Sequence, residues 1–332
     1  KNHGLIFVLD WSGSMSRVML DTIKQLYNLI WFCKKVSIPF EVYAFTNEWK
    51  KPEYDYETGE VINPADFTCS YEKKENLLAV SEHFSLMNLL TSKTNGKQLE
   101  HQMINIWRIA RAFSNFYGAP YSVPTRLGLS GTPLNEAFVC LHQILPQFQK
   151  QNKLQKVQCI VLTDGEANHL SRHVEVKRHW ESEPYMGCRQ LSGGITFLRD
   201  RKTGNTYQVP YGWHGFSDLM LRNLRDNFPT VNFVGIRVLE SRDANHFMKL
   251  YAVPGADLCK IQNDWKKLRS FIIKTSGYHA YFAMSAASLS QDAEFEVDDG
   301  ATKAKIKTAF IKSLKTKKLN KKVLGEFISL VA

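Results

Sequence analysis

The chain has 332 residues, of which 44% are hydrophobic and 23% are charged, which is ordinary globular usage and excludes wholesale disorder. No apolar run approaches the roughly 20 residues of a membrane-spanning helix, so we expect no bilayer crossing. The net charge of +11 does not indicate nucleic-acid binding by the body of the protein, because nine lysines and no acidic residue lie between residues 303 and 322.

Apolar runs and helical spacings alternate along the chain. Gly4 to Leu9 is a continuous apolar run that ends at Asp10, as in a parallel strand covered on both faces. Further strands are predicted at 41–46, 84–90, 157–163 and 231–239. Helices are predicted at 17–35, 98–113, 133–148, about 243–252 and 264–274. Residues 195–209 are predicted to form a β-hairpin that turns at residues 202–205.

This alternation predicts an α/β fold with a doubly wound, mostly parallel sheet. The main domain is expected to span residues 1–277. Two segments, about 47–131 and 166–230, are too long for simple connections and are predicted to be insertions with structure of their own. Residues 278–332 are predicted to be a C-terminal extension, in which an acidic linker at 285–300 precedes two lysine-rich amphipathic helices.

Five oxygen-bearing side chains follow predicted strands or precede a predicted helix. Asp10, Ser12 and Ser14 come directly after the first strand, Thr132 precedes the helix at 133–148, and Asp164 follows the strand at 157–163. Ligands of open parallel sheets bind beyond the carboxyl ends of the strands, where both aspartates are expected. Two carboxylates and three neutral hydroxyls suit a hard divalent cation, which stays electrophilic enough to accept a further carboxylate. The sequence therefore predicts a Mg²⁺ site, with Mn²⁺ and Ca²⁺ as alternatives.

The combined pattern resembles the metal-ion-dependent adhesion site of von Willebrand factor A (VWA) domains. The matching positions are Asp10, Ser12, Ser14, Thr132 and Asp164, and none departs from the pattern. The resemblance covers roughly residues 4–275 without the two predicted insertions. Residues 130–134 and 162–165 look more like the intracellular branch, which includes magnesium and cobalt chelatase subunits and proteins paired with MoxR-type AAA+ ATPases. Similar proteins also occur in large tailed phages.

The resemblance implies a non-enzymatic module that couples an AAA+ ATPase to a target protein, whose Asp or Glu completes the metal shell. The six cysteines contain no Cys-x-x-Cys pair, which argues against a zinc ribbon or a redox pair. A cytoplasmic location is expected, because Cys140 and Cys159 fall inside apolar runs as buried thiols and fit a reducing compartment. A virion is the alternative location for a phage-encoded protein. The predicted insertions and the lysine-rich tail are the surfaces expected to determine the target.

Other functions remain open at this stage. The protein could serve as a structural or assembly protein of a virus particle, or as a metal-dependent hydrolase, although Ser and Thr ligands leave no evident base. The apolar stripe of the lysine-rich tail favours docking on protein over nucleic acid. A zinc site at His169, His173, His179 and Cys188 is a weaker hypothesis, in which His169 and His173 would share a helix face. Glu166 and Asn168 are expected to shape the rim of the Mg²⁺ site.

Overall fold

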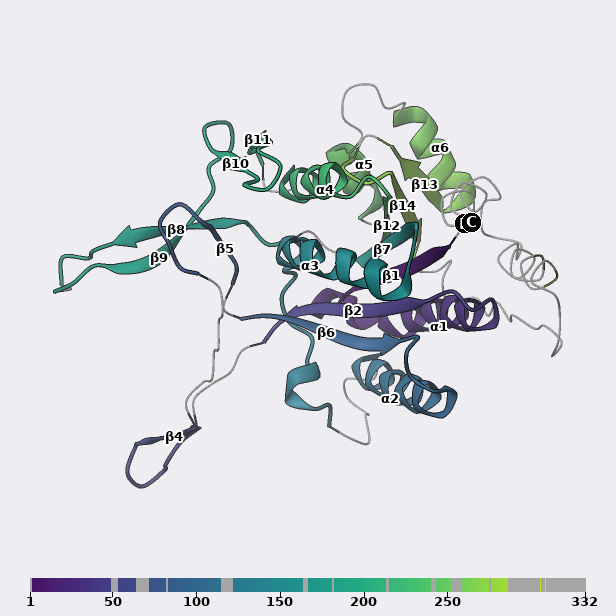
Figure 1. Ribbon diagram of the computed structural model, residues 1–332, viewed down its shortest axis with the longest axis horizontal. Coiled ribbons are helices and arrows are strands. Elements are labelled where there is room, and N and C mark those ends of the chain that lie inside the picture. The colour runs from purple at the N-terminus through teal and green to yellow at the C-terminus, as the bar shows by residue number, and fades with distance from the viewer. Residues whose placement is uncertain are drawn as a thin grey trace.

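The computed structural model describes residues 2–48, 53–63, 72–81, 83–114, 122–163, 167–180, 182–212, 215–239, 243–251, 258–274 and 276–285, and the single residues 305 and 308. A seven-stranded sheet runs through its centre (Figure 1). In spatial order the strands are β13 (Ser270–Ile273), β14 (Ala280–Ser285), β12 (Val231–Leu239), β7 (Lys156–Thr163), β1 (His3–Asp10), β2 (Phe40–Asn47) and β6 (Phe84–Thr91).

The five inner strands are parallel, and both edge strands are antiparallel to their neighbours. If the antiparallel β13 is set aside, the other strands stand in the order 3-2-1-4-5-6 when numbered along the chain. This is the order of a Rossmann-like doubly wound sheet. The predicted α/β fold class is therefore confirmed, and the topology is consistent with a VWA-like fold.

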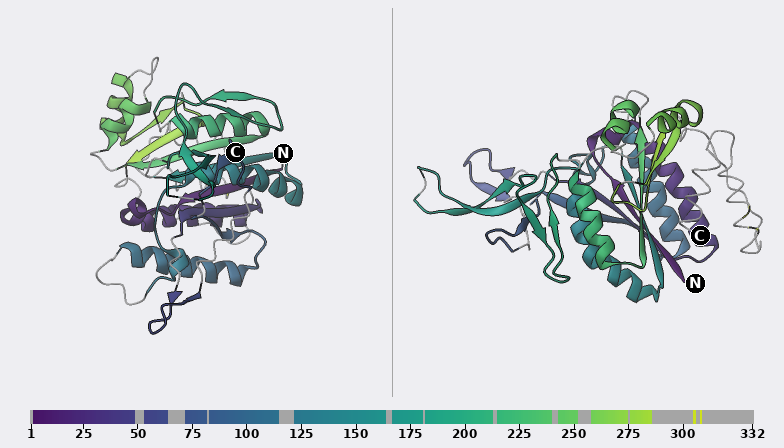
Figure 2. Two further views of the ribbon diagram at one scale, coloured as in Figure 1. Left: turned by 90° about the vertical axis from the view of Figure 1, so that its left-hand side faces the viewer. Right: turned by 90° about the horizontal axis from the view of Figure 1, so that it is seen from above.

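Helices cover both faces of the sheet (Figure 2). One core cluster joins the sheet to α1 (Met19–Lys35) and α2 (Gly96–Ser114), and it contains Leu9. A second cluster joins the sheet to α3 (Leu134–Asn152) and α4 (Gly215–Asn227), and it contains Val8. Side chains alternate between the two faces of a strand, so both faces of β1 are apolar, as its sequence predicts. The remaining helices are η1 (Gly13–Arg17), η2 (Thr125–Leu127), α5 (Ala244–Tyr251) and α6 (Leu258–Leu268).

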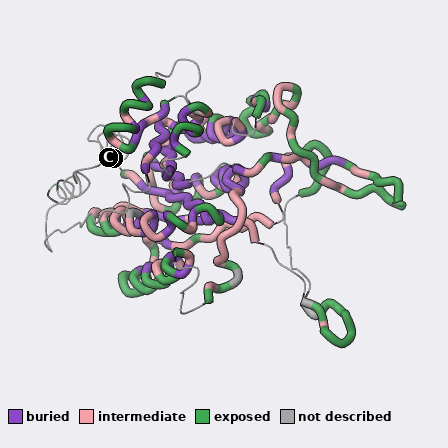
Figure 3. Tube along the Cα trace, turned by 180° about the vertical axis from the view of Figure 1, so that it is seen from behind, coloured by how far each residue is buried: buried purple, intermediate pink, exposed green. Residues whose placement is uncertain are grey.

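Short antiparallel strands extend from the main body (Figure 1). They are β3 (Glu53–Tyr54) with β4 (Val61–Asn63), β5 (Leu78–Ala79) with β8 (Ser171–Val176) and β9 (Tyr185–Gln190), and β10 (Phe197–Arg199) with β11 (Thr206–Gln208). The last pair is the predicted hairpin, in which Leu198 pairs with Tyr207. Figure 3 shows that buried residues concentrate in the central strands, whereas the β8–β9 hairpin is largely exposed.

The segments predicted to be insertions also contribute to the main fold. Within 47–131, β6 pairs with β2 as an edge strand of the central sheet, and the buried side chains of α2 join the core on the α1 side. Within 166–230, α4 supplies buried residues to the cluster around α3. The structured parts of these segments that lie outside the central sheet and its covering helices are the short strands and η2.

The helix predicted at 264–274 ends earlier, and its last residues form a strand. Arg269 has a φ of 53°, in the left-handed region that ends a helix, and Ser270–Ile273 then pairs with β14. The strand β14 begins at Ala280, inside the stretch assigned to the C-terminal extension, and pairs with β12. The acidic linker after Ser285 and the lysine-rich helices lie outside the described residues, apart from 305 and 308.

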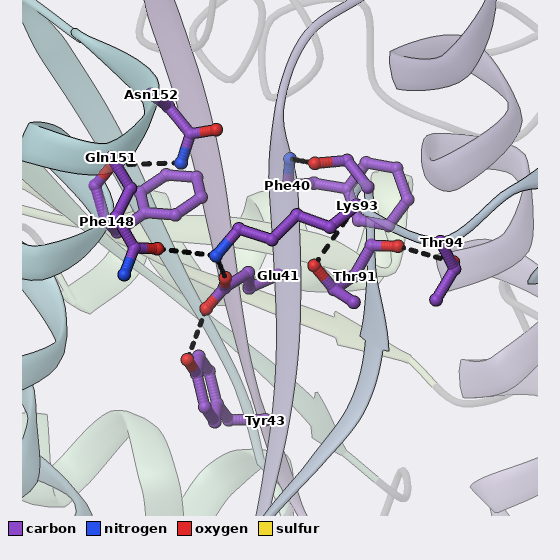
Figure 4. A network of polar contacts seen from close by, with 10 residues as sticks. Phe40, Glu41, Tyr43, Thr91, Lys93, Thr94, Phe148, Gln151 and Asn152 are labelled. Atoms are coloured by element: carbon purple, nitrogen blue, oxygen red, sulfur yellow. Dashed lines mark hydrogen bonds and ion pairs between the residues drawn. The ribbon is translucent and has the colours of Figure 1, made fainter.

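A polar network joins the end of α3 to the β2–β6 edge (Figure 4). Lys93 Nζ lies 3.4 Å from Glu41 Oε1 and also donates to the side chain of Gln151 on α3. The Tyr43 hydroxyl donates to the other oxygen of Glu41. Burial, followed by the interaction with Glu41, raises the pKa of Tyr43. The nearly buried Glu41 carboxylate is thus held by a phenol and an ammonium group.

A second network attaches the β10–β11 hairpin to α4. Asp200 Oδ2 accepts hydrogen bonds from the Nδ2 atoms of Asn223, at 2.7 Å, and Asn227, at 2.6 Å. Asp200 Oδ1 accepts the backbone N–H groups of Lys202 and Thr203 within the turn. Burial acts to raise the pKa of Asp200, but these hydrogen bonds outweigh it and lower the pKa.

Among the described residues, every helix is too short or too polar to cross a membrane.

Candidate metal centre

The order of the central sheet places a ligand-binding position between β1 and β7. From β1 the chain continues to β2 on one side, whereas from β7 it continues toward β12 on the other side. Ligands of doubly wound sheets bind at such a switch point, beyond the carboxyl ends of the strands. Asp10 is the last residue of β1, and Thr163 is the last residue of β7.

The Asp10 carboxylate is buried and held in one orientation. The backbone N–H of Ser12 donates to Asp10 Oδ1 at 3.0 Å, and the hydroxyl of Thr163 donates to Asp10 Oδ2 at 2.6 Å. A carboxylate offers about four lone-pair positions, and these two bonds use one position on each oxygen. The Thr163 bond links the ends of β1 and β7 directly across the switch point.

The two serines of the motif lie together in the loop after β1. The Oγ atoms of Ser12 and Ser14 are 3.0 Å apart, although Ser12 is buried and Ser14 is exposed. The backbone N–H of Gly13 donates to the carbonyl of Ser130 at 2.8 Å, and Ser12 forms a parallel bridge with Ser130. Trp11 anchors this arrangement, because its Nε1 donates to the carbonyl of Leu127 at 2.8 Å. The loop that leads to Thr132 therefore lies beside the Asp10 loop.

Thr132 lies two residues before α3 begins and connects to the segment that follows β7. Its carbonyl accepts the backbone N–H groups of Leu134 and Asn168, both at 2.9 Å. Asn135 is fully buried, and its Nδ2 donates to the carbonyl of Asn168 while its Oδ1 accepts the hydroxyl of Ser217. Asn168 thus lies beside Thr132, and Asn135 ties this segment to α4. The role of Asn168 at the rim of a Mg²⁺ site stays a prediction.

The structure brings the loops of Asp10, Ser12, Ser14 and Thr132 together at one edge of the sheet. Asp164 and Glu166 lie outside the described residues. Thr163, which directly precedes Asp164, contacts Asp10. The part of the candidate site that the structure describes is therefore one carboxylate with neighbouring hydroxyls, and the role of Asp164 stays a prediction.

This donor set fits a hard divalent cation better than a softer one. Carboxylate and hydroxyl oxygens suit Mg²⁺, Ca²⁺ and Mn²⁺, whereas zinc sites use His and Cys. Within the described ranges, no group of three or more His, Cys, Asp and Glu side chains gathers as a metal site. The carboxylate of Asp10 and the hydroxyls of Ser12 and Ser14 are oxygen donors of the kind that fit the Mg²⁺ expected from the sequence.

The histidines after β7 are arranged differently from the helical pair considered above. His173 belongs to strand β8, so it does not share a helix face with His169. His173 is buried and pairs across the hairpin with Cys188, with 3.8 Å between Nδ1 and Sγ. The ring of His169 packs against Phe216. The helical His169–His173 pair is therefore wrong.

Thr163, Ser130 and Asn135 are positioning residues that the sequence pattern alone did not predict. Thr163 could have been found, because it ends an apolar strand directly before a candidate ligand. The contributions of Ser130 and Asn135 depend on backbone and side-chain contacts with segments far away in the sequence.

No protein-family model and no curated protein sequence matches the chain. Among solved structures, the pilus adhesin SpaC from Lactobacillus rhamnosus GG in its open conformation has a TM-score of 0.41 and 13% identity, over 95% of this chain and 30% of SpaC. A second SpaC structure has a TM-score of 0.39 and 12% identity, over 95% of this chain and 31% of SpaC. The vWF domain of the type V pili tip protein Mfa5 from Porphyromonas gingivalis has a TM-score of 0.27 and 12% identity, over 70% of this chain and 52% of that domain. The chain thus matches about a third to a half of these proteins, and the similarities are too distant to carry a functional assignment.

Proposed function

We propose that this protein is a Mg²⁺-dependent protein-binding module without catalytic activity of its own. The observation that carries the proposal is the orientation of the Asp10 carboxylate by the Ser12 N–H and the Thr163 hydroxyl, at the switch point of the sheet. An oriented, buried carboxylate beside paired hydroxyls is preorganised to bind an ion, because little reorganisation is needed when the ion arrives.

In this proposal Asp10, Ser12, Ser14, Thr132 and Asp164 hold the cation. When bound, the ion supplies an electrophilic position that accepts a carboxylate oxygen from a partner protein. The Thr163 hydroxyl and the Ser12 N–H keep the Asp10 carboxylate oriented. The bridge between the loops of residues 12 and 130 keeps the hydroxyl groups at one edge.

The projecting hairpins support a protein partner. Large exposed apolar side chains are found mostly on the short strands and turns outside the central sheet, including Trp180, Tyr185, Phe197 and Tyr211. The guanidinium of Arg178 lies 5.5 Å from the ring centre of Trp180 and 5.7 Å from that of Tyr185. Trp, Tyr and Arg are the residues that contribute most often to protein interfaces. These hairpins would then determine which partner carboxylate reaches the ion.

The partner proposed on the VWA resemblance is an AAA+ ATPase of the MoxR or chelatase type, coupled to a target protein that donates Asp or Glu. The test has two stages, of which the first uses Mn²⁺ as the probe and isothermal titration calorimetry as the assay. We expect wild-type protein to bind one Mn²⁺ per chain and Asp10→Ala to lose measurable binding. Glu175→Gln serves as the matched control, because Glu175 is an exposed carboxylate on β8. Equal binding by wild type and Asp10→Ala would rule out the site.

The second stage asks whether the ion joins the protein to its partner. An AAA+ ATPase encoded beside this protein should be retained on the immobilised wild-type protein with Mg²⁺. Retention should fall with EDTA and with Asp10→Ala, because both remove the bridging ion. Retention that ignores both changes would exclude a metal-bridged interface. Purification with virus particles, without an ATPase, would instead favour the structural alternative.

A further inference from the structure

Asn47 ends strand β2 on the same side of the sheet as the Asp10 carboxylate. Asp10 aligns with Phe45 in the parallel pairing of β1 with β2. Phe45 belongs to the core cluster built around α3, as does Val8, two residues before Asp10. Because strand side chains alternate, Asp10, Phe45 and Asn47 all face the α3 side. Asn47 thus lies one step beyond Asp10 toward the ligand-binding edge.

The Asn47 carboxamide packs directly against the loop that carries Thr132. A Cβ atom placed on Gly131 would lie 2.5 Å from Asn47 Nδ2 and 3.6 Å from Asn168 Nδ2. The first distance is too short for two such atoms, so a glycine is required unless Asn47 moves. Two side-chain amides therefore flank the peptide immediately before Thr132.

The oxygen at the other end of the Asn47 carboxamide has no partner within the part of the chain that the structure describes. Asn47 Oδ1 is buried, and no described residue donates a hydrogen bond to it. Leaving a buried acceptor unpaired costs about 1–3 kcal/mol, and such groups in native proteins are usually satisfied by water or a ligand. A ligand that binds at this edge and carries a hydrogen-bond donor would satisfy the Asn47 oxygen.

We propose that Asn47 is a positioning residue that accepts a hydrogen bond from a water molecule bound to the metal ion. The proposal rests on the proposed function, because it needs the cation at Asp10. Hard cations of this kind keep several of their waters, and a metal-bound water is a stronger donor than free water. The Asn47 oxygen thereby orients a metal-bound water without touching the ion, and it raises the affinity of the site for the ion.

The test measures Mn²⁺ affinity by calorimetry for the full chain and three variants. Asn47→Leu keeps the side-chain size and removes the acceptor, and it should weaken Mn²⁺ binding about 10-fold or more, as loss of an outer hydrogen bond does at other metal sites. Asn47→Asp keeps an oxygen acceptor and adds a negative charge, so its affinity should equal or exceed that of wild type. Thr46→Val is the matched control, because Thr46 Oγ1 is also buried and unpartnered among the described residues. Thr46 is next to Asn47 in β2, so its side chain faces the opposite side of the sheet, and Thr46→Val should bind Mn²⁺ as wild type does.

A melting experiment separates positioning from loss of folding. In EDTA, Asn47→Leu should melt within a few degrees of wild type, whereas the rise in melting temperature on adding Mn²⁺ should be smaller for Asn47→Leu. If Asn47→Leu does not fold, Asn47→Asp decides, and a weaker affinity than wild type would overturn the inference. Wild-type affinity in Asn47→Leu, or an equal loss in Thr46→Val, would also overturn it while leaving the Asp10 site intact. Wild-type affinity in Asp10→Ala would instead refute the proposed function itself.

Discussion

Glu136 should make the stability of this protein fall as the pH rises. It lies in the first turn of α3, is only 5% exposed, and its Oε2 has no hydrogen-bond partner among the described residues. Burial raises the pKa of Glu136 from 4.5 to about 7 and outweighs the hydrogen bond from its own backbone N–H, which lowers the pKa. The folded protein therefore holds a proton that the unfolded chain releases at lower pH.

The sign and size of the effect follow from the two pKa values. A raised pKa means that the stabilising contribution is complete below pH 4.5 and is lost as the pH rises through about 7. The whole difference corresponds to about 3 kcal/mol of unfolding free energy, and about 2.5 kcal/mol of it is lost between pH 5 and pH 8. Glu136→Gln carries no titrating proton and should lack this part of the pH dependence.

The assay is urea unfolding of wild type and Glu136→Gln at pH 5 and pH 8, with EDTA present to exclude metal effects. The free energy of Glu136→Gln minus that of wild type should increase by about 2.5 kcal/mol from pH 5 to pH 8, because all other titrating groups are common to both proteins. Glu175→Gln, at an exposed position, controls for the loss of a charge. A difference that stays constant between the two pH values would refute the reasoning.

Two further predictions concern the polar networks. Asp200→Ala removes the acceptor that binds Asn223 and Asn227 on α4. Amide hydrogen exchange in the β10–β11 hairpin should therefore become about 10-fold faster or more, while exchange in β1 stays unchanged. Unchanged exchange in the hairpin would show that other contacts hold the hairpin on α4. Tyr43→Phe should lower the unfolding free energy by about 1–3 kcal/mol, because it takes a donor from the nearly buried Glu41 carboxylate. Lys93→Ala should cost less than about 1 kcal/mol, since Lys93 is half exposed. The reverse order in urea unfolding would contradict this assignment.

The inner strands could be predicted from the sequence because each one is a largely apolar run within its own segment. The run at 231–239 matches β12 residue for residue, and the run before Asp10 matches β1 closely. A strand with helices on both faces needs apolar side chains at nearly every position, and few other structures tolerate that pattern. The turn at residues 202–205 was predictable for a similar reason, because the Asp200 carboxylate accepts the backbone N–H groups of Lys202 and Thr203 within the turn.

Only part of the candidate site could be predicted from the sequence. Asp10, Ser12 and Ser14 are close in the chain, so their proximity follows from the loop after β1 alone. The Thr163 bond to Asp10 joins residues 153 positions apart, and it exists because β7 pairs with β1 and not with another strand. The burial of Asn47 against Gly131 likewise depends on which loop crosses the end of β2.

The sequence by itself determined where apolar strands end in polar loops, because side-chain periodicity and turn chemistry are local. Only the tertiary structure decided that Ser270–Ile273 is a strand, since four apolar and small residues fit a helix end or a strand equally well. The partner strand β14 supplied hydrogen bonds that a helix end would have left unmade. Pairing with strands far away in the sequence also decided the order of the strands in the sheet. That order determines which loops meet around Asp10.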